Sequence, residues 1–234
     1  MSLPGTVLDV ETPLVNGLPT TLSVLTRDEL AVSPLLEPLV RLTNAAFAAT
    51  HGPPYFLATA ARLPSSAALI SGLDEKALTY ILTQTLEDGE VRVLGSVTDE
   101  PYRQPLPGSD DAATHESRPH LEGEEGREYR RALRLLVTDL TLHRQGVGSF
   151  LLSSLEQRLI QEAERIREET GSPLTHVRWI LDTVADVNAG YYERRGWRLI
   201  DRKLAPPVPT DCGLPIYVAY MDRVLELSSP TRTQ

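Results

Sequence analysis

A glycine-containing turn between an apolar run and a long amphipathic pattern is the feature that most constrains the fold of this sequence. The turn, residues 143–149, reads HRQGVGS, and it follows residues 132–138, whose apolar character is typical of a β-strand. The helical pattern that begins at Val147 has apolar residues at Leu151, Leu155, Leu159, Ala163 and Ile166. A strand, a turn and a helix in this order direct backbone N–H groups and the positive helix end toward one point. The segment therefore predicts a site for an anion that carries phosphate.

The two glycines of the turn, Gly146 and Gly148, leave room for a phosphate group and allow a tight bend. Their spacing differs from the two commonest phosphate loops. A P-loop needs four residues between its glycines and then Lys and Ser or Thr, whereas the dinucleotide-binding fingerprint needs a third glycine. Taken alone, the pair favours a plain tight turn, so the phosphate assignment depends on the rest of the chain.

A second segment, residues 188–197, reads NAGYYERRGW and follows a strand-like run at residues 175–183. In that run Val177, Trp179 and Leu181 alternate with Arg178, Ile180 and Asp182. The pattern from Tyr192 to Trp197 predicts a short helix that ends at Gly196, with an aromatic residue opening the next strand.

Together the two segments resemble the Gcn5-related N-acetyltransferase superfamily. That family has a phosphate loop Arg/Gln-x-x-Gly-x-Gly/Ala after its fourth strand and a Tyr-x-x-x-Gly-Phe signature after its fifth. The 44 residues from Gly148 to Tyr192 leave space for the helix and strand between them. The resemblance covers roughly residues 20–225, is strongest over 130–200, and is weak before residue 90.

The resemblance implies an α/β (α+β mixed) fold in one domain, residues 1–234. Its sheet would be mixed and mostly antiparallel, with six to seven strands, parallel fourth and fifth strands, and flanking helices. The patterning predicts helices over 34–49 and 147–169, and an ambiguous region of one or two helical turns over 55–76. It predicts strands over 20–26, 78–86, 91–98, 129–140, 175–183, 197–203 and 217–224. Asp88-Gly89 indicates a hairpin turn between the second and third of these strands.

The chemistry that the resemblance implies is transfer of an acetyl group from acetyl-coenzyme A to a primary amine by direct attack on the thioester. The pyrophosphate would be held by the loop residues His143, Arg144, Gln145, Gly146, Val147, Gly148 and Ser149. His143 stands where the family has Arg or Gln. The edge of the fourth strand would pair with the pantetheine arm through Leu136, Val137 and Thr138, and a backbone N–H there would polarise the thioester carbonyl.

Tyr192 matches the family's tyrosine that protonates the departing thiolate. The alternative is that Tyr192 is a core aromatic residue, which is the role we expect for Tyr191. The family often has an Asn seven residues before this Tyr, where the present chain has Ala185. Asn188 either serves the pantetheine from a shifted position or caps the helix. Asp182 and Asp139 are candidates for the general base by location only. Both could instead be solvated or capping residues, and a water chain would also suffice.

The net charge of −9 is unevenly spread, because residues 99–126 hold eight acidic groups against Arg103 and Arg118. This proline- and glycine-containing stretch is expected to be a mobile loop that begins at residue 99, with a disordered insertion at 104–126. It is either a solvated loop or a source of long-range attraction for cationic amines. The acidic balance disfavours nucleic acid as a partner.

No apolar run approaches membrane-spanning length and the first basic residue is Arg27, so we expect no membrane association and a cytoplasmic location. The single Cys212 and five scattered histidines predict no metal site. A monomer or a homodimer is expected. The leading function is acetyl-CoA-dependent acetylation of a small-molecule amine. The alternatives are acetylation of a protein lysine or N-terminus, and a non-catalytic acyl-CoA-binding module.

Overall fold

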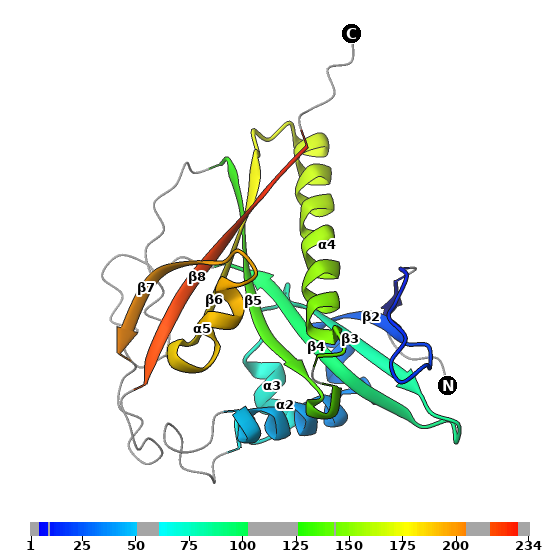
Figure 1. Ribbon diagram of the computed structural model, residues 1–234. Coiled ribbons are helices and arrows are strands. Elements are labelled where there is room, and N and C mark those ends of the chain that lie inside the picture. The colour runs from blue at the N-terminus through cyan, green and yellow to red at the C-terminus, as the bar shows by residue number, and fades with distance from the viewer. Residues whose placement is uncertain are drawn as a thin grey trace. The chain divides into compact units, whose positions relative to one another are not determined.

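Figure 1 shows a computed structural model of the protein, which describes residues 5–8, 10–50, 61–102, 126–142, 144–204 and 216–228. The helices are α1 (Arg27–Ala31), α2 (Leu36–Thr50), α3 (Ser66–Ser71), α4 (Val147–Thr170) and α5 (Ala185–Glu193), and a 3-10 turn η1 spans Leu140–Leu142. The strands are β1 (Thr6–Val7), β2 (Thr21–Thr26), β3 (Leu78–Thr85), β4 (Val91–Pro101), β5 (Glu128–Thr138), β6 (His176–Val184), β7 (Arg198–Leu204) and β8 (Tyr217–Glu226). The predicted disordered insertion at 104–126 lies, except for Gly126, outside the described residues.

The described strands form one sheet in the order β1-β2-β3-β4-β5-β6-β8-β7. It is mixed and mostly antiparallel, with β5 and β6 parallel, which confirms the predicted fold class. The sheet has eight strands where six to seven were expected. The additional strand is the two-residue β1, which pairs antiparallel with β2. Two residues are too few to show the alternating pattern that predicts a strand.

The chain divides into two compact units. The first contains Met1–Pro101, Leu133–Ser153 and Pro207–Ile216, and therefore includes β1 to β4, α1 to α3, the end of β5 and the start of α4. The second contains Tyr102–Ala132, Ser154–Pro206 and Tyr217–Gln234, with the start of β5, the rest of α4, and β6, α5, β7 and β8.

The core of the first unit is aliphatic. Helix α2 buries a stripe at Leu36, Leu39 and Val40, which packs in one cluster with residues such as Ile81 of β3 and Val93 of β4. Apolar burial of this kind contributes about 25 cal/mol per Å² and fixes the helix on the sheet. The predicted hairpin is confirmed: Gly89 adopts a φ of +83°, and the Leu86 N–H donates to the Glu90 carbonyl over 2.8 Å.

Strand β4 runs to Pro101, beyond its predicted end at residue 98. Asp99 and Glu100, read from sequence as part of the acidic loop, are instead buried at the end of this strand. Glu100 can be buried because the Arg134 guanidinium of β5 donates to its carboxylate over 2.8 Å. The expectation of a loop beginning at residue 99 was therefore wrong.

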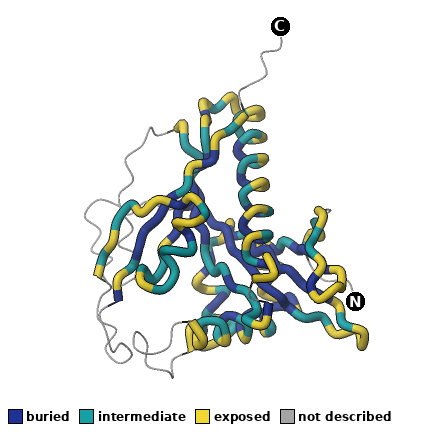
Figure 2. Tube along the Cα trace, viewed as in Figure 1, coloured by how far each residue is buried: buried dark blue, intermediate teal, exposed yellow. Residues whose placement is uncertain are grey.

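Helix α4 confirms the predicted amphipathic pattern, since Leu151, Leu155, Leu159 and Ala163 are all buried. In Figure 2 its residues alternate between buried and exposed around the helix axis. The helix ends at Thr170, and Gly171 follows with a φ of +67°, the conformation that a glycine C-cap supplies.

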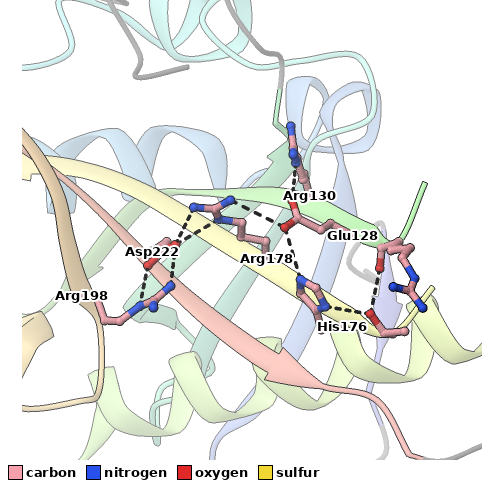
Figure 3. A network of polar contacts seen from close by, with 8 residues as sticks. Glu128, Arg130, His176, Arg178, Arg198 and Asp222 are labelled. Carbon is pink, nitrogen blue, oxygen red and sulfur yellow. Dashed lines mark hydrogen bonds and ion pairs between the residues drawn. The ribbon is translucent and has the colours of Figure 1, made fainter. Parts of the chain in front are cut away.

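In the second unit, β6 buries Val177, Trp179 and Leu181, as its alternation predicted, but it also buries Ile180 on the opposite face. The register pairs Ile180 of β6 and Arg198 of β7 with Asp222 of β8, so these side chains share one sheet face. Figure 3 shows the polar network on this face, which is built from Glu128, Arg130, His176, Arg178, Arg198 and Asp222.

Candidate functional site

The end of β5 is irregular where the sequence predicted pantetheine pairing. Leu135 has a φ of +48°, which is rare for a branched, non-glycine residue and interrupts the extended run of the strand. Of the three residues that follow, Val137 is buried and Leu136 and Thr138 are half-buried. The strand ends at Thr138, and the next N–H, that of Asp139, donates to the Leu94 carbonyl of β4 over 2.8 Å.

The predicted phosphate loop forms the tight turn that opens α4. Arg144 and Gly146 both have positive φ angles, +67° and +82°, and only glycine adopts the second without steric cost. Residues Arg144, Gln145 and Gly146 are exposed, whereas Val147 is buried. The first hydrogen bond of the helix runs from the Phe150 N–H to the Gly146 carbonyl over 2.8 Å. His143 lies outside the described residues.

Helix geometry leaves the first N–H groups of α4 without intrahelical acceptors, and these belong to the residues at the turn. The helix macrodipole adds partial positive charge at the same end, and the Arg144 side chain is exposed beside it. Gly148 and Ser149 lie in this first turn, half-buried and exposed respectively. The arrangement can accept a phosphate or pyrophosphate group from solvent.

Sequence reasoning missed the residue that sets how closely this turn approaches the sheet. Gly95 lies in the middle of β4, and a Cβ atom placed on it would be 3.0 Å from the Val137 carbonyl oxygen and 3.1 Å from Val147 Cγ1. The absence of a side chain therefore lets the end of β5 and the start of α4 meet at one point. A glycine inside a strand pattern is the signal that could have indicated this close approach.

Tyr192, in the second unit, is a buried residue of α5. Its ring packs edge-on against Trp197, with centroids 5.7 Å apart, and against Tyr191 at 5.1 Å. Burial raises the pKa of Tyr192 well above its usual value, with smaller upward contributions from Tyr191 and Asp182, and Arg195 acts in the opposite direction. The phenol is therefore protonated at neutral pH, so Tyr192 can donate a proton or hydrogen bond but cannot serve as a resting base.

Asn188 does not cap the helix, so that alternative for it was wrong. Helix α5 begins at Ala185 with Val184 as its N-cap residue, and Asn188 lies within the first turn and a half. Its side-chain amide donates to Thr183 Oγ1 over 3.1 Å, which holds the amide against the end of β6. Asp182, one residue before Thr183, is exposed, and its charge acts on Tyr192.

Asp139, the other candidate base, is engaged in structural contacts. Its carboxylate accepts from the Thr141 N–H over 2.9 Å, from the Thr141 hydroxyl over 2.7 Å, and from the Arg92 guanidinium. Partial burial acts to raise the pKa of Asp139, but the bonds from Thr141 and Arg92 outweigh it and lower the pKa. A carboxylate held ionised in this way is a weak base, so the capping interpretation of Asp139 is confirmed.

Within the described residues, no group of three or more His, Cys, Asp or Glu side chains could hold a metal ion. None of the helices in the described part of the chain is both long and apolar enough to cross a membrane.

Comparison with known proteins found no matching family model and no matching curated protein. Several solved structures are similar to this chain. NAA60 from Arabidopsis thaliana, in complex with acetyl-CoA, is 12% identical, and the match covers 88% of this chain and 98% of that chain with a TM-score of 0.51. The ribosomal-protein-S18-alanine N-acetyltransferase from Escherichia coli is 16% identical over 92% of this chain and 100% of that chain, with a TM-score of 0.48. An aminoglycoside 6'-N-acetyltransferase complexed with coenzyme A is 13% identical over 90% of this chain and 99% of that chain, with a TM-score of 0.47.

The chain therefore has the fold of the Gcn5-related N-acetyltransferase superfamily, as the resemblance of its two motifs implied.

Proposed function

We propose that this protein is an N-acetyltransferase that transfers an acetyl group from acetyl-CoA to a primary amine of a small molecule. The observation that carries the proposal is the turn at the start of α4, where Arg144, Gly146 and the first helical N–H groups form an exposed anion-binding geometry. In this proposal residues 143–149 hold the pyrophosphate, mostly through backbone N–H groups. Leu136, Val137 and Thr138 hold the pantetheine arm, and Asn188 contributes to the same arm.

The reaction would proceed by direct attack. The amine nitrogen forms a bond to the thioester carbonyl carbon, and the carbon–sulfur bond then breaks. A backbone N–H at the end of β5 stabilises the oxyanion that develops on the carbonyl oxygen. The Tyr192 phenol, which is protonated at neutral pH, gives its proton to the leaving thiolate. Asp182, exposed at the end of β6, is proposed to take the proton that the amine loses.

A thiol-release assay with acetyl-CoA tests this proposal against its alternatives. The panel of acceptors should contain simple amines, polyamines, amino acids, and peptides with a free lysine or N-terminus. Release with a small amine supports the proposal, whereas release with peptides alone would assign the protein to protein acetylation. Binding of acetyl-CoA without release with any acceptor would make the protein a non-catalytic binding module. Absence of acetyl-CoA binding would contradict all three functions.

A further inference from the structure

Three side chains of the first unit form a cluster: Arg92 of β4, and Asp139 and Thr141, which follow β5. Asp139 and Thr141 come directly before the proposed pyrophosphate turn in the sequence. Arg92 lies 47 residues before Asp139 and donates both to its carboxylate and, over 3.2 Å, to Thr141 Oγ1. Thr141 in turn donates to Asp139 through its backbone N–H and its hydroxyl. The Asp139 side chain is 15% exposed and that of Arg92 is 39% exposed, so solvent screens the ion pair only in part.

Two successive backbone hydrogen bonds lead from this cluster to the turn. The Asp139 carbonyl accepts from the Leu142 N–H over 3.0 Å, and the Leu142 carbonyl accepts from the Gln145 N–H over 3.1 Å. The Gly146 carbonyl then accepts the first hydrogen bond of α4. Asp139 is itself fixed to β4, because its N–H donates to the Leu94 carbonyl. The Asp139 carboxylate therefore holds the first residue of a hydrogen-bonded backbone segment that ends at the proposed anion site.

We propose that Arg92, Asp139 and Thr141 are positioning residues for the turn that binds the pyrophosphate of acetyl-CoA. They would act through the backbone of residues 140–146, and none of them is assigned a contact with the ligand. The inference rests on the proposed function, since it concerns the same site. It identifies the side chains that hold the exposed, positive-φ residues Arg144 and Gly146 in one conformation.

The physical argument concerns preorganisation. A carboxylate that accepts charge-assisted and neutral hydrogen bonds from three donors holds a short turn more firmly than backbone contacts alone. Without it the turn would populate other conformations, and the apparent Kd rises as the fraction in the binding-competent conformation falls. If that fraction falls to about a tenth, acetyl-CoA binds about tenfold more weakly. The contacts between protein and pantetheine are unaffected by such a loss.

The test compares three substitutions, Asp139→Asn, Thr141→Val and Arg92→Met, with the control Glu29→Gln. Glu29 is a matched control because its carboxylate bonds the N–H and hydroxyl of Thr26 at the start of α1, in the same unit and with the same chemistry. Calorimetry gives the Kd for CoA, and hydrogen exchange gives the protection of the amides of residues 144–149. Turnover with S-acetylpantetheine, which lacks the pyrophosphate, is measured beside turnover with acetyl-CoA.

The expected result is CoA binding weakened by about tenfold in Asp139→Asn, with faster exchange at 144–149, and no change in Glu29→Gln. The kinetic loss should appear as a higher KM for acetyl-CoA at similar kcat, with S-acetylpantetheine kinetics unchanged. Thr141→Ser, which keeps the hydroxyl, should restore the affinity for CoA that is lost in Thr141→Val. This restoration distinguishes loss of the hydroxyl contact from a folding defect in one variant. Wild-type protein that binds CoA while all three variants bind it equally well overturns this inference and leaves the proposed function standing. Wild-type protein that does not bind CoA overturns both.

Discussion

At the residue scale, the phenol of Tyr192 is the group whose chemistry is easiest to isolate. Substitution by Phe removes one hydroxyl and keeps the ring that packs against Trp197. If Tyr192 protonates the thiolate, Tyr192→Phe should lower kcat by about 10²-fold, with little change in the Kd for acetyl-CoA. Steady-state kinetics and calorimetry measure the two quantities separately.

The matched control for this substitution is Tyr191→Phe. Tyr191 is the neighbouring phenol, and the guanidinium of Arg195 lies 3.7 Å from the centre of its ring. The Phe variant keeps that ring, so kcat should be close to wild type. An unaltered kcat in Tyr192→Phe would remove Tyr192 from the mechanism and leave it as a core aromatic residue.

Gly95 allows a second residue-scale prediction, on stability. An Ala at this position would place its Cβ 3.0 Å from Leu151 Cδ1 and from the Val137 carbonyl oxygen, which is closer than such atoms normally approach. Overpacking of this kind costs about 1–3 kcal/mol, so Gly95→Ala should lower the free energy of unfolding by that amount. Denaturant unfolding followed by circular dichroism measures it.

Gly190 in α5 is the control for Gly95. A Cβ there meets only Arg194 Nη1, at an ordinary 3.5 Å. Because Ala is favoured over Gly inside a helix, Gly190→Ala should raise the free energy of unfolding, by roughly 0.5–1 kcal/mol. A Gly95→Ala protein as stable as wild type would mean that α4 shifts without cost, and that Gly95 does not set its distance from the sheet.

At the element scale, a buried carboxylate of β8 joins arginines of β6 and β7 in the second unit. Asp222 of β8 is 1% exposed and is bound by two guanidinium groups (Figure 3), with Arg178 Nη2 and Arg198 Nη2 at 3.0 and 3.1 Å from its Oδ2. Removing one partner of a buried pair costs about 3–5 kcal/mol, because the remaining charge stays buried. Asp222→Ala should therefore destabilise the protein by about 3 kcal/mol, the lower end of this range, because Arg178 is only 13% exposed but keeps its contact with Glu128 at 3.6 Å.

Arg198→Ala is the contrasting substitution in the same network. Its side chain is 68% exposed, so water can replace the lost contacts, and the expected cost is at most about 1 kcal/mol. Thermal and denaturant unfolding of the two variants give the comparison. Equal effects on the free energy of unfolding would contradict the dependence on burial.

The helices and strands also show which features the hydrophobic pattern of the sequence could predict. Helix α4 was predicted over 147–169 and spans Val147–Thr170, because its apolar period and its glycine stop are both local in sequence. The end of β4 was predicted wrongly, because the burial of Glu100 depends on Arg134, 34 residues further along the chain. The contact between Arg92 and Asp139 likewise joins residues that are 47 positions apart in the sequence. The strand, the turn and the helix of the candidate site could be predicted from local residue types. The side-chain contacts that hold these elements together could not be predicted from the sequence.

At the scale of the whole molecule, charge is the property that bears on the acceptor. The chain has a net charge of −9, and residues 103–125 alone carry six acidic groups and two arginines, which gives −4. A field of this sign raises the encounter rate of a cationic amine by about tenfold or more at low salt, and it weakens as the Debye length falls to about 10 Å at 0.1 M salt.

We therefore expect kcat/KM for a cationic acceptor to fall by roughly threefold or more as salt rises, and kcat to stay nearly constant, because screening affects encounter and not chemistry.

A variant with the six acidic residues of 103–125 changed to Asn or Gln should show a lower kcat/KM at low salt and a shallower salt dependence, and should equal wild type at high salt. A zwitterionic acceptor of the same reactivity is the control, since its net charge is zero and its kcat/KM should not respond. If the neutralised variant keeps the wild-type salt dependence, the acidic segment is a solvated insertion with no part in acceptor capture. Any preference for cations would then have to come from carboxylates elsewhere in the chain, such as the exposed Asp182.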